Sequence, residues 1–179
     1  MTTGVGRPAT ALAPVDAAER AEYASLYDRP LLELGAMARE RARAAVPGGV
    51  VSYIADRNIN YTNVCVSECR FCAFYRQPDD ADAYVIDRET LDRKIRETLD
   101  LGGTQILLQG GMHPHLDLTY YLDLLKHIHD HFTIHVHGFS PPEIAHMADR
   151  SSLTIKQTLK QLMDAGLNSI PGGGAEILD

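Results

Sequence analysis

Residues 58–76 read Asn58-Ile59-Asn60-Tyr61-Thr62-Asn63-Val64-Cys65-Val66-Ser67-Glu68-Cys69-Arg70-Phe71-Cys72-Ala73-Phe74-Tyr75-Arg76, a short strand pattern that runs directly into three closely spaced cysteines. These three are the only cysteines in the sequence. Three thiolates at this spacing can bind three corners of a cubane [4Fe–4S] cluster and leave the fourth iron without a protein ligand. A strand that feeds a ligand loop is what the first βα unit of a parallel barrel provides. We therefore predict that Cys65, Cys69 and Cys72 are the metal ligands.

Other uses of the three thiols are less favoured. A disulfide framework usually has an even number of cysteines, and no secretory signal pattern precedes them. Structural zinc is the main alternative, although it needs a fourth ligand, which one of the eight histidines could provide. Three inert, buried thiols are not expected at this spacing. Free thiols and a low-potential cluster both indicate a reducing compartment, so we expect a cytoplasmic protein.

Composition excludes several classes of partner. The sequence has 179 residues, of which 45% are hydrophobic and 23% are charged, as in ordinary globular proteins. No apolar run approaches the roughly 20 residues that span a bilayer. The net charge is -7 and there is no basic patch, so nucleic acid is not expected as a partner. We expect a small-molecule substrate, no membrane and no nucleic acid.

The N-terminal part differs in pattern from the rest. Residues 1–15 are rich in alanine and proline and are predicted to be a disordered tail. Residues 16–48 read as helical, and Pro30 divides them into two helices. We predict that they form a small helical cap on the domain that follows, which spans residues 49–179.

Strand and helix patterns alternate after this cap. Apolar strand patterns start near residues 58, 104, 133 and 168, each separated from the next by a helical pattern. This alternation predicts an α/β fold with a parallel sheet. A closed (β/α)₈ barrel has eight strands and roughly 250 residues. We therefore predict the N-terminal half of a TIM-type barrel, about four βα units, and interpret the chain as truncated after its fourth strand.

Polar and glycine motifs follow each predicted strand, where barrel enzymes place their chemistry. Gly110 and Gly111 allow a ligand to approach the backbone closely, or simply make a tight turn. Ser140 and Glu143 have the spacing of a helix capping box, and alternatively line a pocket as a polar pair. Gly173 lies in a triple-glycine segment whose amides can bind hydroxyls or an anion, or which is a flexible turn.

Three further residues are candidate catalytic groups. His135 and His137 alternate on the third predicted strand, so their side chains point to the same face. They are interpreted as interior histidines that shape the pocket or donate hydrogen bonds. The alternative from another class is a zinc-dependent hydrolase that uses this pair. Glu176, after the fourth strand, could bind a ribose diol or accept a proton.

The cysteine spacing resembles the motif of the radical SAM superfamily, which binds S-adenosyl-L-methionine (SAM) at a [4Fe–4S] cluster. Residues 60–76, 102–111, 137–144 and 169–177 closely resemble the cyclic dehypoxanthinyl futalosine synthases of the futalosine route to menaquinone. The likeness begins at about residue 31 and covers the N-terminal half of that family. Its relatives, the aminofutalosine synthases and the deazaflavin synthase subunits, are the alternatives.

The resemblance implies two cofactors, the cluster and SAM, and an electron donor such as a flavodoxin or ferredoxin. It places Phe71 near the SAM adenine; alternatively this ring shields the cluster from water. It also implies that Gly110 and Gly111 receive the SAM amino group through their backbone. Met112 replaces the acid of the superfamily's Gly-Gly-Glu motif, so only the backbone role carries over.

The implied reaction starts when one electron cleaves SAM to a 5′-deoxyadenosyl radical. This radical abstracts hydrogen from the ribose C4′ of dehypoxanthine futalosine, and the sugar radical adds to the benzoate ring of the substrate. Loss of a proton and an electron then restores aromaticity, so a base is needed. His135, His137 and Glu176 are the candidates. Because radicals need an enclosed, dry pocket, we expect the chain by itself to be inactive.

Overall fold

The computed structural model describes residues 16–173. They belong to two compact units that divide between Ser52 and Tyr53, and each unit is described by itself.

The first unit is helical. It contains α1 (Ala17–Ser25), a 3₁₀ helix (Leu26–Asp28) and α2 (Leu31–Ala45). Pro30 directly precedes α2, so the interruption expected at this proline is observed. Neither α1 nor α2 contains a buried residue within the described part of the chain. Their role as a cap stays a prediction.

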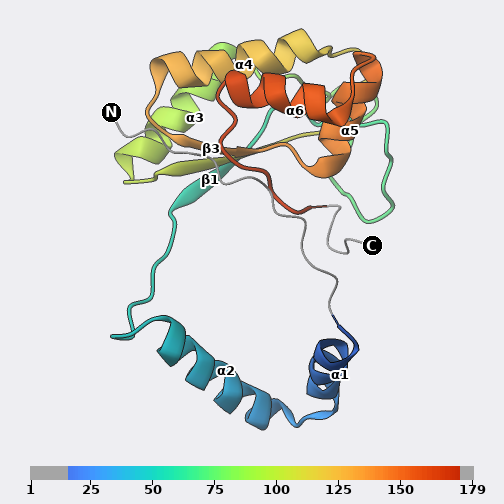
Figure 1. The fold of residues 1–179 in the computed structure, drawn as a ribbon. Coiled ribbons are helices and arrows are strands. Elements are labelled where there is room, and N and C mark those ends of the chain that lie inside the picture. The colour runs from blue at the N-terminus through green and yellow to red at the C-terminus, as the bar shows by residue number, and fades with distance from the viewer. Residues whose placement is uncertain (1–15, 174–179) are drawn as a thin grey trace. The chain divides into compact units, whose positions relative to one another are not determined.

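The second unit is built on a parallel sheet with the strand order β1-β2-β3. The strands are β1 (Asp56–Asn60), β2 (Gln105–Gln109) and β3 (His135–Gly138). The helices are α3 (Arg88–Asp100), α4 (Leu118–His131), α5 (Pro141–Arg150) and α6 (Ile155–Asp164). Each strand is followed by a helix along the chain (Figure 1). This order confirms the predicted α/β class and is consistent with part of a β/α barrel.

The fourth predicted strand, a short one near residue 168, is present only as one parallel bridge between Ser169 and His137. The Gly138 N–H donates to the Ser169 carbonyl oxygen at 2.9 Å. Gly166, with a φ of 118°, and Pro171 bound this segment closely, and neither favours a longer strand. For residues 16–173, the prediction of four strands is therefore corrected to three strands and a bridge.

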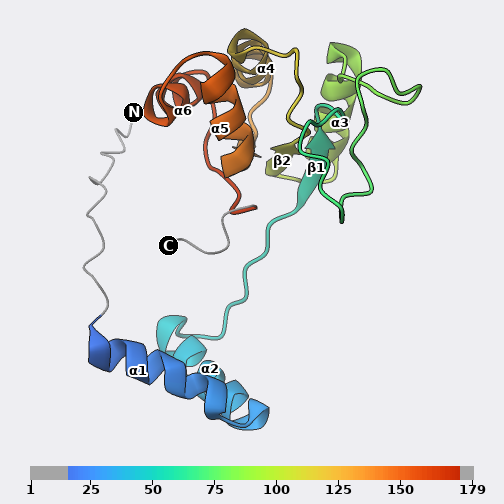
Figure 2. The same ribbon diagram turned by 90° about the vertical axis from the view of Figure 1, so that its right-hand side faces the viewer.

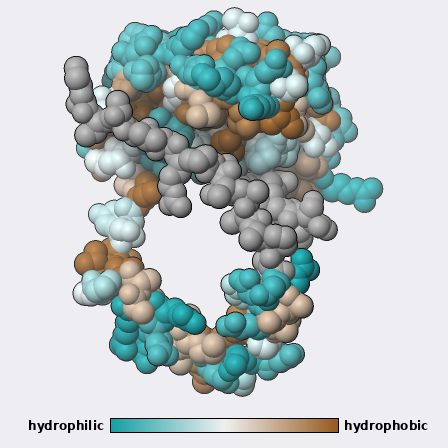
Figure 3. All heavy atoms as spheres, viewed as in Figure 1, coloured by the Kyte–Doolittle hydropathy of each residue, from teal (hydrophilic) through white to brown (hydrophobic). Residues whose placement is uncertain are grey.

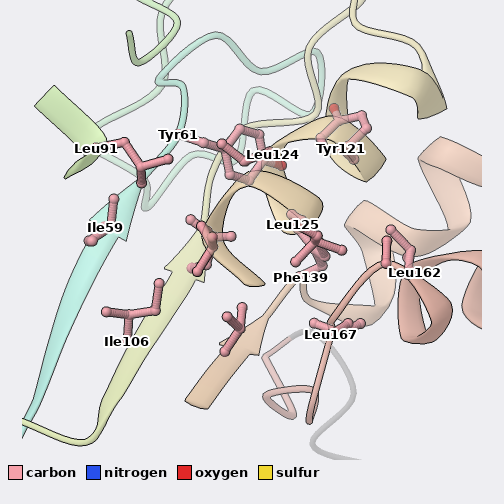
Figure 4. Packing of buried hydrophobic residues seen from close by; sticks show 14 of the residues in the cluster. Ile59, Tyr61, Leu91, Ile106, Tyr121, Leu124, Leu125, Phe139, Leu162 and Leu167 are labelled. Carbon is pink, nitrogen blue, oxygen red and sulfur yellow. The ribbon is translucent and has the colours of Figure 1, made fainter. Parts of the chain in front are cut away.

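The hydrophobic core fills the space between one face of the sheet and the helices (Figure 4). Alternate strand residues, among them Ile59, Ile106 and Val136, point into it and are buried. Helical residues complete the cluster, notably Leu91, Ile95, Leu124, Leu125, Ile128 and Leu162. The outer surface of these helices is largely hydrophilic (Figure 3). No helix among residues 16–173 is long and apolar enough to cross a membrane.

The opposite face of the sheet is polar. Because Ile59, Ile106 and Val136 point to the helices, the residues between them point the other way. This face carries Asn58, Asn60, Gln105, Leu107, Gln109, His135 and His137. None of them is buried in the described structure. Figure 2 shows β1 and β2 with helix α3 beside them. In a closed barrel the face turned away from the helices lines the interior, so the interior expected here is suited to a polar ligand.

Candidate functional site

The cysteine loop lies between β1 and α3 and is closed at its base by hydrogen bonds. The Ile86 N–H donates to the Tyr61 carbonyl oxygen at 2.7 Å, and Thr62 forms an antiparallel bridge with Val85. The Thr62 hydroxyl also donates to the Tyr84 carbonyl oxygen at 2.6 Å. The two ends of the loop are therefore held side by side, as a ligand loop requires.

A second set of contacts, which we call the clasp, consists of Asn63, Arg76 and Asp82. The Arg76 N–H donates to the Asn63 carbonyl oxygen at 2.8 Å, and the Asn63 side-chain amide donates to the Asp82 carbonyl oxygen at 2.8 Å. The Arg76 Nε lies 2.7 and 2.8 Å from the two Asp82 carboxylate oxygens, and this carboxylate raises the pKa of Arg76. The Cys65 N–H donates to the Arg76 carbonyl oxygen at 3.2 Å. The clasp therefore holds the chain on both sides of the thiols.

The three cysteines are free thiols and are half-exposed. The Cys72 N–H donates to the Cys69 carbonyl oxygen at 2.9 Å, which forms a turn between the second and third thiol. Among residues 16–173, no three His, Cys, Asp or Glu side chains converge closely enough to hold a metal ion. This statement applies to the cysteines and equally to His135 and His137. Thiolates are the usual ligands of iron–sulfur clusters, so three accessible thiols on one loop with a closed base fit a cluster chemically. To bind the cluster, the three thiols must move closer to one another.

The turn after β2 packs directly against this loop. A Cβ at Gly111 would lie 2.1 Å from the Val64 carbonyl oxygen and 2.8 Å from the Cys65 Cβ. A Cβ at Gly110 would lie 2.7 Å from the Tyr61 ring. The Gly111 N–H donates to the Thr62 carbonyl oxygen at 3.0 Å. The two glycines are therefore needed for the close approach of the strand end to the cysteines, and they form one site with the loop.

Glu143 joins the ends of three elements. Its Oε1 accepts from the Tyr61 hydroxyl at 2.7 Å and from the Gly110 N–H at 3.0 Å. Its Oε2 accepts from the Ser140 N–H at 2.7 Å and from the Ser140 hydroxyl at 2.5 Å. Glu143 is only 4% exposed. Burial raises the pKa of Glu143, and the donors at Ser140, Tyr61 and Gly110 oppose this effect.

This network bears on two predictions and adds one residue. The capping-box interpretation of Ser140 and Glu143 is confirmed, since Glu143 accepts from the Ser140 N–H. The Glu143 carboxylate points into the protein and is occupied by four donors, so it does not line an open pocket. Sequence reasoning missed Tyr61, which is fully buried. Its only signal was a large aromatic residue between the strand and the cysteines. Burial next to Glu143 raises the pKa of Tyr61 well above its usual range.

His135 and His137 meet at a single hydroxyl group. The Ser169 Oγ lies 2.7 Å from the His135 Nε2 and 2.6 Å from the His137 Nδ1. The expectation that both histidines point to one face is therefore confirmed. Sequence reasoning did not single out Ser169, because nothing in its local pattern distinguishes it from a serine in a turn.

The remaining candidates are spread around the site. The Phe71 side chain is 92% exposed, so its contact with the SAM adenine or the cluster stays a prediction. A Cβ at Gly173 would lie 3.7 Å from the Gln109 side-chain nitrogen, which places this glycine beside the end of β2. Glu176 lies outside the described residues.

Comparison with known proteins gives the following relationships. The family model described as "Radical SAM superfamily" matches residues 59–175. The chain is similar to a cyclic dehypoxanthine futalosine synthase of Halalkalibacterium halodurans, with 46% identity over 155 residues, which cover 86% of the chain and 42% of that protein. It is 45% identical over 141 residues to a 5-amino-6-(D-ribitylamino)uracil–L-tyrosine 4-hydroxyphenyl transferase of Methanopyrus kandleri, covering 78% and 38% of the two proteins.

A third relative is an FO synthase of Streptomyces avermitilis, with 42% identity over 153 residues, 85% of the chain and 18% of that protein. The chain thus spans less than half the length of each of these relatives. The matched residues include the cysteine loop, the glycine turn, the Glu143 network and the histidine pair.

Proposed function

The chain belongs to the radical SAM superfamily, and on that basis we propose that it provides the cluster and SAM sites of a cyclase of the futalosine route to menaquinone. The proposed reaction converts dehypoxanthine futalosine to its cyclic product. The observation that carries the proposal is the packing of the cysteine loop on Gly111, where a Cβ would lie 2.8 Å from the Cys65 Cβ. The similarity to a futalosine synthase supports this member of the family. Because the chain is also similar to a tyrosine transferase and to an FO synthase, the activities of those two relatives are the alternatives.

The proposed ligands of the [4Fe–4S] cluster are Cys65, Cys69 and Cys72. When bound, the cluster and SAM together supply a 5′-deoxyadenosyl radical that can abstract hydrogen from a substrate. The proposed role of Gly110 and Gly111 is to offer their backbone to the methionyl end of SAM, next to the thiols. In this arrangement Glu143 holds the Gly110 N–H, so the turn is pre-formed before a ligand binds.

The proposed role of the polar face is to bind the substrate and to accept its proton. His137 is half-buried on this face and pairs in register with Leu107 of the central strand β2, so it is the proposed base. The substrate is a nucleoside derivative in this proposal, and amide and imidazole side chains such as Asn60, Gln109 and His137 suit its hydroxyl groups. The proposed electron donor is a flavodoxin or ferredoxin.

The zinc hydrolase has no observation in its favour. One ring nitrogen of each histidine is occupied by Ser169, and no third ligand converges on the pair within the described part of the chain.

Anaerobic reconstitution with iron and sulfide tests the proposal. We expect about four irons per chain and, after reduction, an EPR signal that changes when SAM is added. A Cys69→Ser variant should lose most of the iron, because a ligand is replaced. A Val66→Ala variant, changed at a neighbouring, exposed position that is not a proposed ligand, should keep it. Iron binding by the parent chain no greater than that of Cys69→Ser, or a signal unmoved by SAM, would contradict the proposal.

A further inference from the structure

We propose that Ser169 connects His135 and His137 into a proton relay between the polar face of the sheet and solvent. Both contacts to the Ser169 Oγ are short, at 2.7 Å from the His135 Nε2 and 2.6 Å from the His137 Nδ1. Two histidines that share one hydroxyl are not independent groups, because the protonation of each ring affects the other through that hydroxyl.

The backbone holds this hydroxyl in place. Ser169 is the bridge partner of His137, and its carbonyl oxygen accepts from the Gly138 N–H at 2.9 Å. The neighbouring Asn168 side chain accepts from the Val136 N–H at 2.7 Å. The serine is therefore fixed on both sides at the edge of β3. The three side chains meet because of the sheet register and not because of a local sequence motif.

The number of protons limits the states of this cluster. A serine hydroxyl carries one hydrogen, and a neutral imidazole carries one N–H and one bare nitrogen. When the hydroxyl donates to the His135 Nε2, it accepts from the His137 Nδ1–H. When it donates to the His137 Nδ1, it accepts from the His135 Nε2–H. In the first arrangement both neutral rings carry their proton on Nδ1, and in the second both carry it on Nε2, so the tautomer of one ring selects the same tautomer in the other.

A proton can pass along this chain with all atoms balanced. A proton taken up at the His137 Nε2 releases the Nδ1 proton to the Ser169 Oγ. The hydroxyl hydrogen moves to the His135 Nε2, and the His135 Nδ1 proton leaves to solvent. One proton enters and one leaves, and no oxidant or reductant is needed. At the end both rings have changed from the Nδ1–H to the Nε2–H tautomer, and the reverse transfer restores the starting tautomers.

The surroundings give the relay a direction. His137 is half-buried on the polar face, whereas His135 is exposed and lines a hollow at the amino ends of the strands, together with His129 and Thr104. The other ionisable group near this end of the strands is Asp56. Its register partner is Gln105, and Gln105 is in turn the register partner of His135. The Gln105 amide donates to the Asp56 carboxylate at 3.2 Å. Solvent on the side of His135 is thus the acceptor of the transferred proton.

The purpose of the relay rests on the proposed function. The proposed cyclisation releases one proton when the aromatic ring is restored, and His137 would accept it. The relay then carries this proton away from an interior in which radical chemistry needs little water. The coupling of the two histidines is a property of this chain and does not depend on the substrate.

The experiment is imidazole ¹H–¹⁵N NMR of the ¹⁵N-labelled chain without cofactors, at a pH where both rings are neutral. In the parent chain we expect the same tautomer, or the same mixture of tautomers, at His135 and His137. Ser169→Ala should abolish this match, so that the tautomer of one ring no longer follows that of the other. Ser169→Thr, which retains a hydroxyl, should restore it. Ser151→Ala, which removes a half-buried serine at the end of α5, is the matched control and should leave the pattern unchanged.

Two outcomes would overturn the relay: different tautomers at the two histidines in the parent chain, or tautomers that still match in Ser169→Ala. The His129 resonances monitor folding in every variant. Iron loading of Ser169→Ala should equal that of the parent chain, because Ser169 is not in the cysteine loop. Failure of all chains to bind the cluster, with the coupling intact, would refute the proposed function and leave the relay standing.

Discussion

Gly111 shows how strongly the site depends on single residues. Alanine at this position places a Cβ 2.1 Å from the Val64 carbonyl oxygen, which no small adjustment of a side chain can relieve. We expect Gly111→Ala to displace the cysteine loop and to reduce the iron bound on reconstitution several-fold. Gly35→Ala is the control, since nothing lies within 4 Å of its added Cβ and alanine favours helix α2 by about 0.5–1 kcal/mol. Equal iron in Gly111→Ala and the parent chain would refute the packing argument.

Glu143 is buried and accepts from four donors, so its carboxyl oxygens matter for folding. Glu143→Gln replaces one acceptor oxygen by a donor, so buried donors such as the Tyr61 hydroxyl lose their partner, at a cost of about 1–3 kcal/mol. Denaturant unfolding measures this loss. The exposed Glu89→Gln, in the first turn of α3, serves as the control and should change little.

The pH dependence of Glu143 has a definite sign. Burial raises the pKa of Glu143 above its unfolded value, so the folded protein binds this proton more tightly. The contribution to stability is complete below the unfolded pKa and is lost as the pH rises through the folded pKa. The stability of the parent chain relative to Glu143→Gln should therefore fall as the pH rises from about 4.5. A difference that is constant over this range would show that the carboxyl is not perturbed.

At the scale of elements, the clasp determines whether the cysteine loop is organised before metal binds. Arg76→Met removes the bidentate contact to Asp82 but leaves the thiols in place. We expect faster loss of iron to a chelator and faster proteolysis between residues 65 and 76 in the metal-free chain. Arg93→Met, which removes an ion pair to Glu97 on the surface of α3, is the control. The same chelation rate in both variants would mean that the clasp does not support the loop.

The apolar side of helix α4 packs in the hydrophobic core, and Leu125 is one of its buried residues (Figure 4). This residue is fully buried, so Leu125→Ala should destabilise the second unit by about 2–5 kcal/mol. Leu101→Ala, at a position that is 87% exposed, should change stability by less than about 0.5 kcal/mol. Denaturant unfolding followed by far-UV circular dichroism distinguishes the two. A loss of stability in Leu125→Ala as small as that in Leu101→Ala would show that Leu125 contributes little to the packing of α4.

At the scale of the whole molecule, the chain provides an organised ligand loop on an incompletely enclosed sheet. Within residues 53–173 the sheet has three strands, and His135 and Asn58 on its polar face are exposed. Because radical intermediates need exclusion of water, we expect no cyclisation of dehypoxanthine futalosine by this chain, even with the cluster and SAM bound. Product analysis by mass spectrometry checks this. Cyclic product formed by the purified chain would show that these residues are sufficient.

Local patterns in the sequence were enough for the capping box at Ser140 and for the alternation of strands and helices. These features depend on residues a few positions apart, so their spacing is visible without a fold. The cysteine ligand set rests on spacing in the same way and stays a prediction. The extent of the fourth strand was not visible locally, because the number of its residues that pair with β3 depends on packing between segments.

Other features of the site exist only because distant segments come together. Tyr61 reaches Glu143 across 82 positions, and His137 reaches Ser169 across 32. Tyr61 and Ser169 are unremarkable among their neighbours in the sequence, and their roles arise when parallel strands bring their ends to one edge. Hydrogen bonds require partners within about 3 Å, and such distances between remote residues depend on sheet register and packing. These distances therefore cannot be inferred from the spacing of residues along the chain.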